Sequence, residues 1–164
     1  MSLATDPLST YLHDHLAGAR HAIELVQAIR DEFKGDPLGT FAASILNEIK
    51  ADRDTLQHLA ERVGSGSSQI KEIAAWLGEK VARLKMVPGT KDGLGTFEAL
   101  EFLEIGIHGK WALWRALLAI APSDPRLQGT DFEVLSARAE SQRSSVDQLR
   151  LEWARMVFEN IEKS

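Results

Sequence analysis

Two carboxylates, Glu48 and Asp52, stand one helical turn apart within an apolar helical stripe. At about 100° per residue, Asp52 lies near the centre of the apolar face and Glu48 lies beside it. A carboxylate in a dry core costs several kcal/mol unless it is paired, protonated or bound to a metal. The spacing therefore predicts a polar site inside the protein, although it does not indicate a reaction. The stripe consists of Leu38, Phe41, Ile45, Ile49, Leu56, Leu59 and Val63.

Partners for these carboxylates are available on other predicted helices. Arg143 interrupts the apolar stripe of the last helix, and a guanidinium is always charged and binds a carboxylate through two hydrogen bonds. His15 lies at the edge of an apolar face and is expected near the level of Asp52. A core-edge histidine bonded to a carbonyl or carboxylate is the simpler interpretation of His15. Glu104 borders the apolar stripe of the helix expected at about 96–121. It belongs either to a polar site or to the ordinary solvated surface of that helix.

Composition limits the chemistry. The chain of 164 residues has a net charge of -5, with 44% hydrophobic and 26% charged residues, which is typical of a globular protein. Because it contains no cysteine, a metal site would need oxygen and imidazole ligands. The acidic balance argues against nucleic acid or an anionic membrane as the main partner.

No segment has the pattern of a membrane span or a signal peptide. The most apolar segment, 97–121, is interrupted by charged and imidazole side chains, and the N-terminus lacks a basic start followed by an apolar run. We therefore expect a soluble cytoplasmic protein. The interrupting residues are Glu98, Glu101, Glu104, His108, Lys110 and Arg115.

Periodicity and capping signals predict five helices in a single domain over residues 1–164. Asp6-Pro7 and Asp36-Pro37 are helix starts, because aspartate caps free amides and proline suits the first helical position. Thr130 and Glu133 have the spacing of a capping box. The expected helices cover about 7–34, 37–63, 68–86, 96–121 and 131–162.

This layout of two helical hairpins joined by a long crossover resembles the ferritin-like superfamily over nearly the whole chain. The resemblance implies an all-α fold: a ferritin-like antiparallel four-helix bundle whose long crossover, residues 64–95, carries an additional helix. Within the superfamily, the chain resembles an uncharacterised bacterial branch with degenerate di-metal ligands.

The resemblance also implies where metal ligands would stand. Di-metal members carry one glutamate on each of two helices and Glu-x-x-His on each of the other two. Glu48 matches the first residue of one Glu-x-x-His, but Ala51 stands at its histidine position and Asp52 follows. Glu140-Ser-Gln-Arg143 stands at the other, with arginine in place of histidine.

The two single-glutamate positions are matched in part. By its separation from Glu48, His15 stands about where the first helix would carry its glutamate. Glu104 is the counterpart on the third bundle helix, with His108 one turn later. Since the chain contains no intact Glu-x-x-His, the resemblance does not extend to oxidase, oxygenase or ferroxidase activity.

These residues are compatible with two functions. The first is a ferritin-like bundle that has lost the standard di-metal site and acts as a structural or binding module, in a homodimer formed through the Trp111/Trp114 helix and the crossover helix. The alternative is a metal-binding protein, able to support oxidoreductase chemistry, that holds iron, manganese or zinc through His15, Glu48, Asp52, Glu104 and His108. A small-molecule pocket between helices is a third interpretation that nothing in the sequence singles out. No catalytic residue or substrate is predicted.

Overall fold

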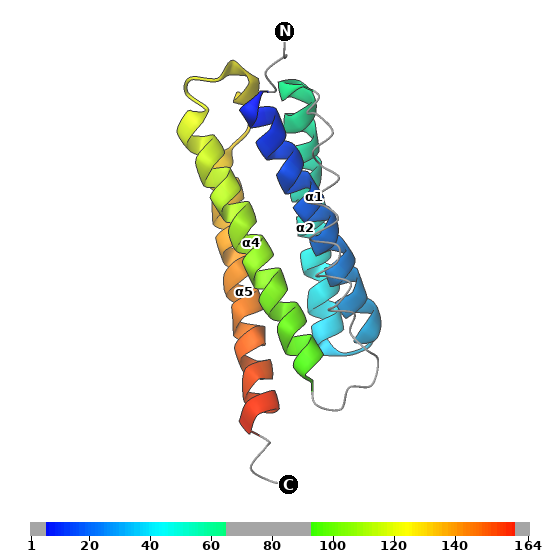
Figure 1. Ribbon diagram of the computed structural model, residues 1–164. Helices are drawn as coiled ribbons and strands as arrows, with labels where there is room; N and C mark the ends of the chain where they lie inside the picture. Colours follow the sequence, from blue (N-terminus) through cyan, green and yellow to red (C-terminus); the bar gives the residue numbers. More distant parts are fainter. Residues whose placement is uncertain (1–5, 65–92, 160–164) are drawn as a thin grey trace.

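The computed structural model describes residues 6–64 and 93–159, and within these ranges it contains helices and no strand (Figure 1). The all-α prediction is confirmed for this part of the chain. The predicted helix 68–86 lies outside the described residues. The elements are α1 (Pro7–Glu32), α2 (Pro37–Val63), α4 (Leu94–Ile120), the short 3-10 helix η1 (Pro125–Leu127) and α5 (Phe132–Glu159).

The first two helices begin at the predicted caps. A carboxylate oxygen of Asp6 accepts the backbone N–H of Leu8 at 2.9 Å, and Asp36 accepts that of Leu38 at the same distance. Each bond satisfies one of the amides that a helix start leaves unpaired. Gly35, between the two helices, has a φ of +89°, which glycine adopts without the steric cost of a side chain.

The later helices start differently from the prediction. α4 begins two residues before Thr96, after Gly93 in the left-handed conformation, and it has no side-chain cap. At α5, the carboxylate of Asp131 accepts the backbone N–H of Val134 at 3.0 Å. The capping-box prediction for Thr130 was therefore wrong, because its neighbour Asp131 supplies the capping oxygen.

The helices are arranged as two pairs, α1 with α2 and α4 with α5, and the chain direction reverses within each pair (Figure 1). The Ser9 hydroxyl donates to the carbonyl of Gly64 at 2.8 Å, so the start of α1 meets the end of α2. Arg62, also at the end of α2, donates to the carbonyl of Gln128 at 2.9 Å. One end of the first pair is thus fixed against the loop between α4 and α5.

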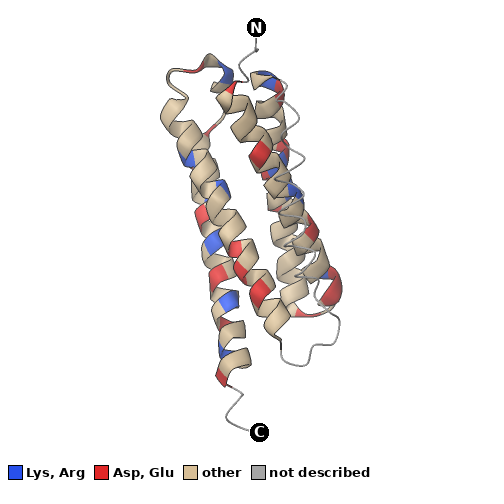
Figure 2. Ribbon diagram, viewed as in Figure 1, with Lys and Arg blue, Asp and Glu red and all other residues tan. Residues whose placement is uncertain are grey.

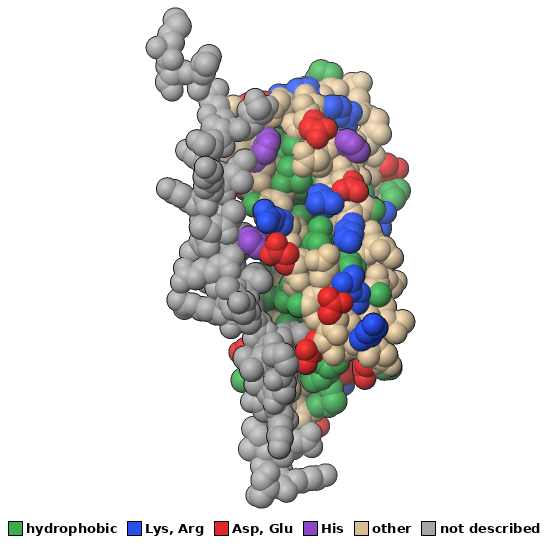
Figure 3. Space-filling model, turned by 90° about the vertical axis from the view of Figure 1, so that its right-hand side faces the viewer, with side chains coloured by type: hydrophobic (Ala, Val, Ile, Leu, Met, Phe, Trp, Pro, Cys, Tyr) green, Lys and Arg blue, Asp and Glu red, His purple; other side chains and the backbone are tan. Residues whose placement is uncertain are grey.

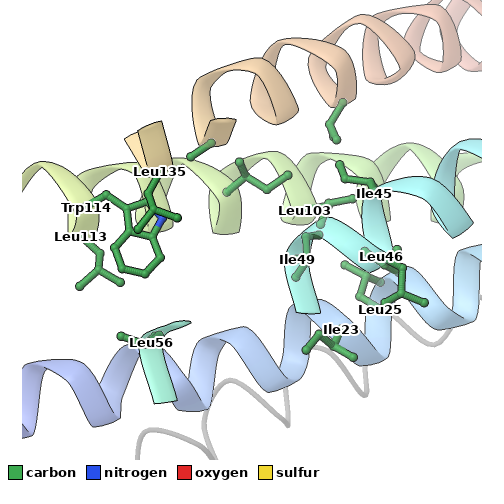
Figure 4. Close-up of a cluster of buried hydrophobic side chains, with 14 of the residues drawn as sticks. Ile23, Leu25, Ile45, Leu46, Ile49, Leu56, Leu103, Leu113, Trp114 and Leu135 are labelled. Atoms are coloured by element: carbon green, nitrogen blue, oxygen red, sulfur yellow. The ribbon is translucent and has the colours of Figure 1, made fainter. Parts of the chain in front are cut away.

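The core is formed by buried aliphatic side chains together with Trp114 and Phe132, whose ring centroids are 6.2 Å apart. Leu113 and Trp114 extend from α4 toward α1, with Leu56 of α2 nearby (Figure 4). Trp114 is 0% exposed, so its side chain belongs to the core.

Charged side chains cover the outside. Basic and acidic residues alternate along α5 (Figure 2), where the guanidinium of Arg150 lies 3.3 Å from Glu101 of α4. On the face shown in Figure 3, charges of both signs are mixed with hydrophobic side chains. In the described ranges, every helix falls short of the length or the hydropathy that crossing a membrane demands.

Candidate functional site

A buried ionic cluster surrounds Asp52 in the middle of the structure. α2 places Asp52 on its core face, as the stripe predicts, and the residue is only 1% exposed. The Lys110 ammonium of α4 lies 2.5 Å from Oδ2, and the Arg138 guanidinium of α5 donates to Oδ1. Each oxygen of this carboxylate therefore has a cationic partner.

Gln142 connects this ion pair to the second carboxylate. Its amide Nε2 donates to Glu48 Oε2 at 2.8 Å and lies 3.5 Å from Asp52 Oδ2, while its Oε1 accepts from Lys110. One amide side chain of α5 thus joins two acids of α2 and a base of α4. In the sequence, Gln142 is visible only as an interruption of the α5 stripe.

Burial changes the pKa of Lys110 more than its charged partners do. It lowers the pKa of the ammonium below the usual value, and the carboxylate of Asp52 offsets part of this effect. The hydrogen-bonded pair with Asp52 is therefore the interaction that keeps the charged form in this low-dielectric site.

Arg143 was predicted to neutralise Glu48, Asp52 and Glu104, and this is confirmed for Glu104 and wrong for Glu48 and Asp52. Its guanidinium lies 3.0 Å from Glu104 and 2.9 Å from Glu140, and its side chain is 31% exposed. These acids raise the pKa of Arg143, and the arginine in turn lowers the pKa of Glu140. Successive residues of a helix face directions about 100° apart, so Gln142 points inward where its neighbour Arg143 faces the helix edge.

The five candidate metal ligands are divided among several places. Glu48 and Asp52 are joined through Gln142, although only Asp52 is buried, whereas Glu104 is paired with Arg143. Among the residues that the structure describes, no three histidine or acidic side chains converge in a way that could hold a metal ion.

The two candidate histidines make aromatic contacts. His15 meets the edge of the Tyr11 ring at a centroid distance of 4.7 Å, and burial lowers the pKa of its imidazole. His108 stacks on Trp111 at 5.3 Å and is exposed. Metal binding by these five residues stays a prediction.

A cavity of about 490 Å³ lies next to the cluster, between α1, α2 and α4. Its wall is mostly apolar, and it includes Asp52, Lys110, His15 and the indole of Trp114. The indole nitrogen of Trp114 is buried and has no hydrogen-bond partner in the described part of the chain. No feature of the sequence favours a pocket at this place over any other.

The two cationic partners of Asp52, Lys110 and Arg138, were missed by sequence reasoning. Lys110 carried one signal, since it is a lysine inside the most apolar segment of the chain. Arg138 carried none, because the polar side of α5 contains several arginines of similar spacing.

Comparison of the chain with family models, with curated proteins and with solved structures finds no match in any of the three. The ferritin-like assignment therefore stays a prediction, and the function has to be argued from the cluster and the cavity.

Proposed function

We propose that this chain is a ferritin-like bundle whose buried central carboxylate, Asp52, is neutralised by basic side chains in place of metal ions, and that it works as a binding module. The observation that carries the proposal is the pairing of both Asp52 oxygens, one with Lys110 and the other with Arg138.

The two cationic side chains that donate to Asp52 favour an ion-paired carboxylate over a metal centre at this place. A divalent ion bound to this carboxylate would lie beside an ammonium and a guanidinium, and like charges repel strongly in a medium of low dielectric constant. The positive charge that a metal would supply is already provided by the protein. A buried ion pair of this kind adds little net stability, but it selects one arrangement of the helices over others.

The positions of the helix ends support the ferritin-like part of the proposal. Arg62 at the end of α2 bonds to Gln128 and Thr130, which follow the end of α4. Since α2 and α4 end on the same side, the end of α2 and the start of α4 are separated by about the length of α4, roughly 40 Å for its 27 residues. A long crossover between two hairpins is what the superfamily requires.

A homodimer belongs to the same proposal. Apolar side chains remain exposed on α4 and α5, among them Ile105, Val134, Met156 and Phe158. Exposed apolar side chains of this size are common at association sites.

Elemental analysis tests the proposal. The protein is expressed with added iron, manganese and zinc, dialysed without chelator and analysed beside the Glu48→Ala variant. We expect no stoichiometric metal in either protein. One or two metal ions per chain in the wild type, lost in Glu48→Ala while helicity is kept, would establish the metal-binding alternative instead.

A further inference from the structure

We propose that the outer face of α4 binds a second copy of this chain, in a symmetric contact in which the two α4 helices run antiparallel. The inference rests on the homodimer of the proposed function and assigns its interface.

The outer face of α4 is apolar along most of its length. At about 100° per residue, it lies opposite the stripe that α4 buries in the core. Four large apolar side chains on it have exposed fractions from 36% to 58%. Small residues continue the face, and Glu98 is the charged residue among them. The large side chains are Leu94, Phe102, Ile105 and Ile120, and the small residues are Gly109, Ala112, Ala116 and Ala119.

The spacing on this face is that of a coiled coil. From Glu98 to Ala119 its members recur at alternating intervals of four and three residues. Such a repeat keeps the side chains of one helix in a single seam against a second helix. Because this seam points away from the core of its own chain, it is suited to a helix of another molecule.

The face is complementary to itself when two copies run antiparallel. With a two-fold axis level with Ile107, Phe102 of one copy faces Ala112 of the other, and Ile105 faces Gly109. Each large side chain then meets a small residue, and facing positions of this kind interdigitate. A parallel pair would place Phe102 against Phe102 and leave space where Gly109 meets Gly109.

Gly109 has no packing role within the described chain. Glycine in a helix interior is less favourable than alanine. A Cβ added at Gly109 meets no atom within 4 Å, so its own chain does not require a glycine there. Opposite Ile105 of a second copy, the missing side chain makes room for the isoleucine.

The charges on α4 favour the same direction. Acidic side chains lie toward the start of the helix and basic ones toward its end (Figure 2). Glu101 and Arg115 stand two heptads apart at one edge of the apolar face. In the antiparallel pair, Arg115 of one copy lies beside Glu101 of the other, whereas a parallel pair would bring like charges together.

Sedimentation velocity of the purified full-length protein measures the oligomeric state. We expect a wild-type dimer whose dissociation constant rises by at least about 100-fold in Ile105→Arg, because the interface would then bury an unpaired charge. Gly109→Leu should weaken the dimer as well, since it fills the space for Ile105. Val134→Arg is the matched control, because Val134 of α5 has the same exposed fraction of 58% but lies off this face. We expect it to stay dimeric.

Cysteine pairing tests the direction of the helices, since the chain contains no cysteine of its own. The variants Phe102→Cys and Ala112→Cys are mixed and oxidised, and mass spectrometry identifies the disulfide-linked dimers. We expect mixed dimers in preference to dimers of either variant with itself. Phe102→Cys linked mainly to itself would indicate a parallel pair and would overturn the inference.

The other contradicting outcomes separate the interface from the proposed function. A wild-type dimer that folded Ile105→Arg and Gly109→Leu leave intact, or an equal loss in Val134→Arg, would overturn this interface and keep the homodimer. A monomeric wild type would overturn the homodimer as well. Metal content is measured separately, and stoichiometric metal would overturn the pairing of Asp52 with basic side chains whatever the oligomeric state.

Discussion

The ammonium of Lys110 on α4 lies 2.5 Å from Oδ2 of Asp52 on α2, so an ion pair joins helices through residues that are 58 positions apart in the chain. Arg138 of α5 binds the other oxygen of the same carboxylate. Asp52 therefore connects the α1–α2 pair to both helices of the α4–α5 pair, in addition to the apolar packing between them.

Gln142→Leu should lower the free energy of unfolding by about 1–3 kcal/mol. The substitution removes the amide that bonds Glu48 and Lys110, and buried polar groups that lose their partner lose that much. Urea denaturation followed by circular dichroism measures the change.

The adjacent substitution Arg143→Met is the control for Gln142→Leu. Arg143 pairs with Glu104 and Glu140 at the partly exposed edge of α5, where such pairs contribute about 0–1 kcal/mol. If Arg143→Met lowers the free energy of unfolding more than Gln142→Leu does, the assignment of Gln142 as the inward-facing residue is wrong.

Gly39→Ala should destabilise the α1–α2 junction by about 1–3 kcal/mol, the usual range for overpacking. A Cβ at Gly39 would lie 2.0 Å from the carbonyl oxygen of Phe33, so the backbone would have to move. The matched variant Gly18→Ala, where the added carbon meets no atom within 4 Å, should raise the melting temperature because alanine favours a helix. Equal melting temperatures for the two variants would refute this account of the junction.

His15 should make the protein less stable in mild acid. Burial lowers the folded-state pKa of His15 below the value of 6.5, with Asp14 opposing the shift. Between those two pKa values the unfolded chain binds more protons than the folded protein, so the free energy of unfolding falls as pH falls below 6.5. Urea denaturation at about pH 7.5, 6.0 and 5.0 should show a smaller loss in His15→Gln than in the wild type. The same pH dependence in both proteins would assign the effect to other groups.

The helices and their starts could be predicted because their signals are local. Asp6-Pro7 and Asp36-Pro37 mark helix starts within two residues, and the apolar stripes repeat over a few turns. The start of α5 was predicted from the capping spacing of Thr130, but Asp131 makes the cap. Both side chains suit the capping position, and only the backbone geometry selects between them.

The partners of Asp52 could not be predicted in the same way. Its burial follows from one helix, but contact with Lys110 and Arg138 depends on how three helices are rotated about their axes. A rotation of about 100° separates Gln142 from Arg143, so an error in orientation exchanges the buried amide for the edge arginine. The cavity is also invisible in the sequence, because it arises where side chains from three helices leave space between them.

A double-mutant cycle on Asp52 and Lys110 tests the central claim most directly. The free energies of unfolding of the wild type, Asp52→Asn, Lys110→Met and the double variant are measured by urea denaturation in buffer containing EDTA. If the two side chains neutralise each other, each single variant leaves a buried charge with fewer partners, and we expect a coupling energy of about 2 kcal/mol or more. A coupling energy below about 0.5 kcal/mol, the range for independent sites, would contradict the ion pair and with it the proposal that basic side chains take the place of metal ions.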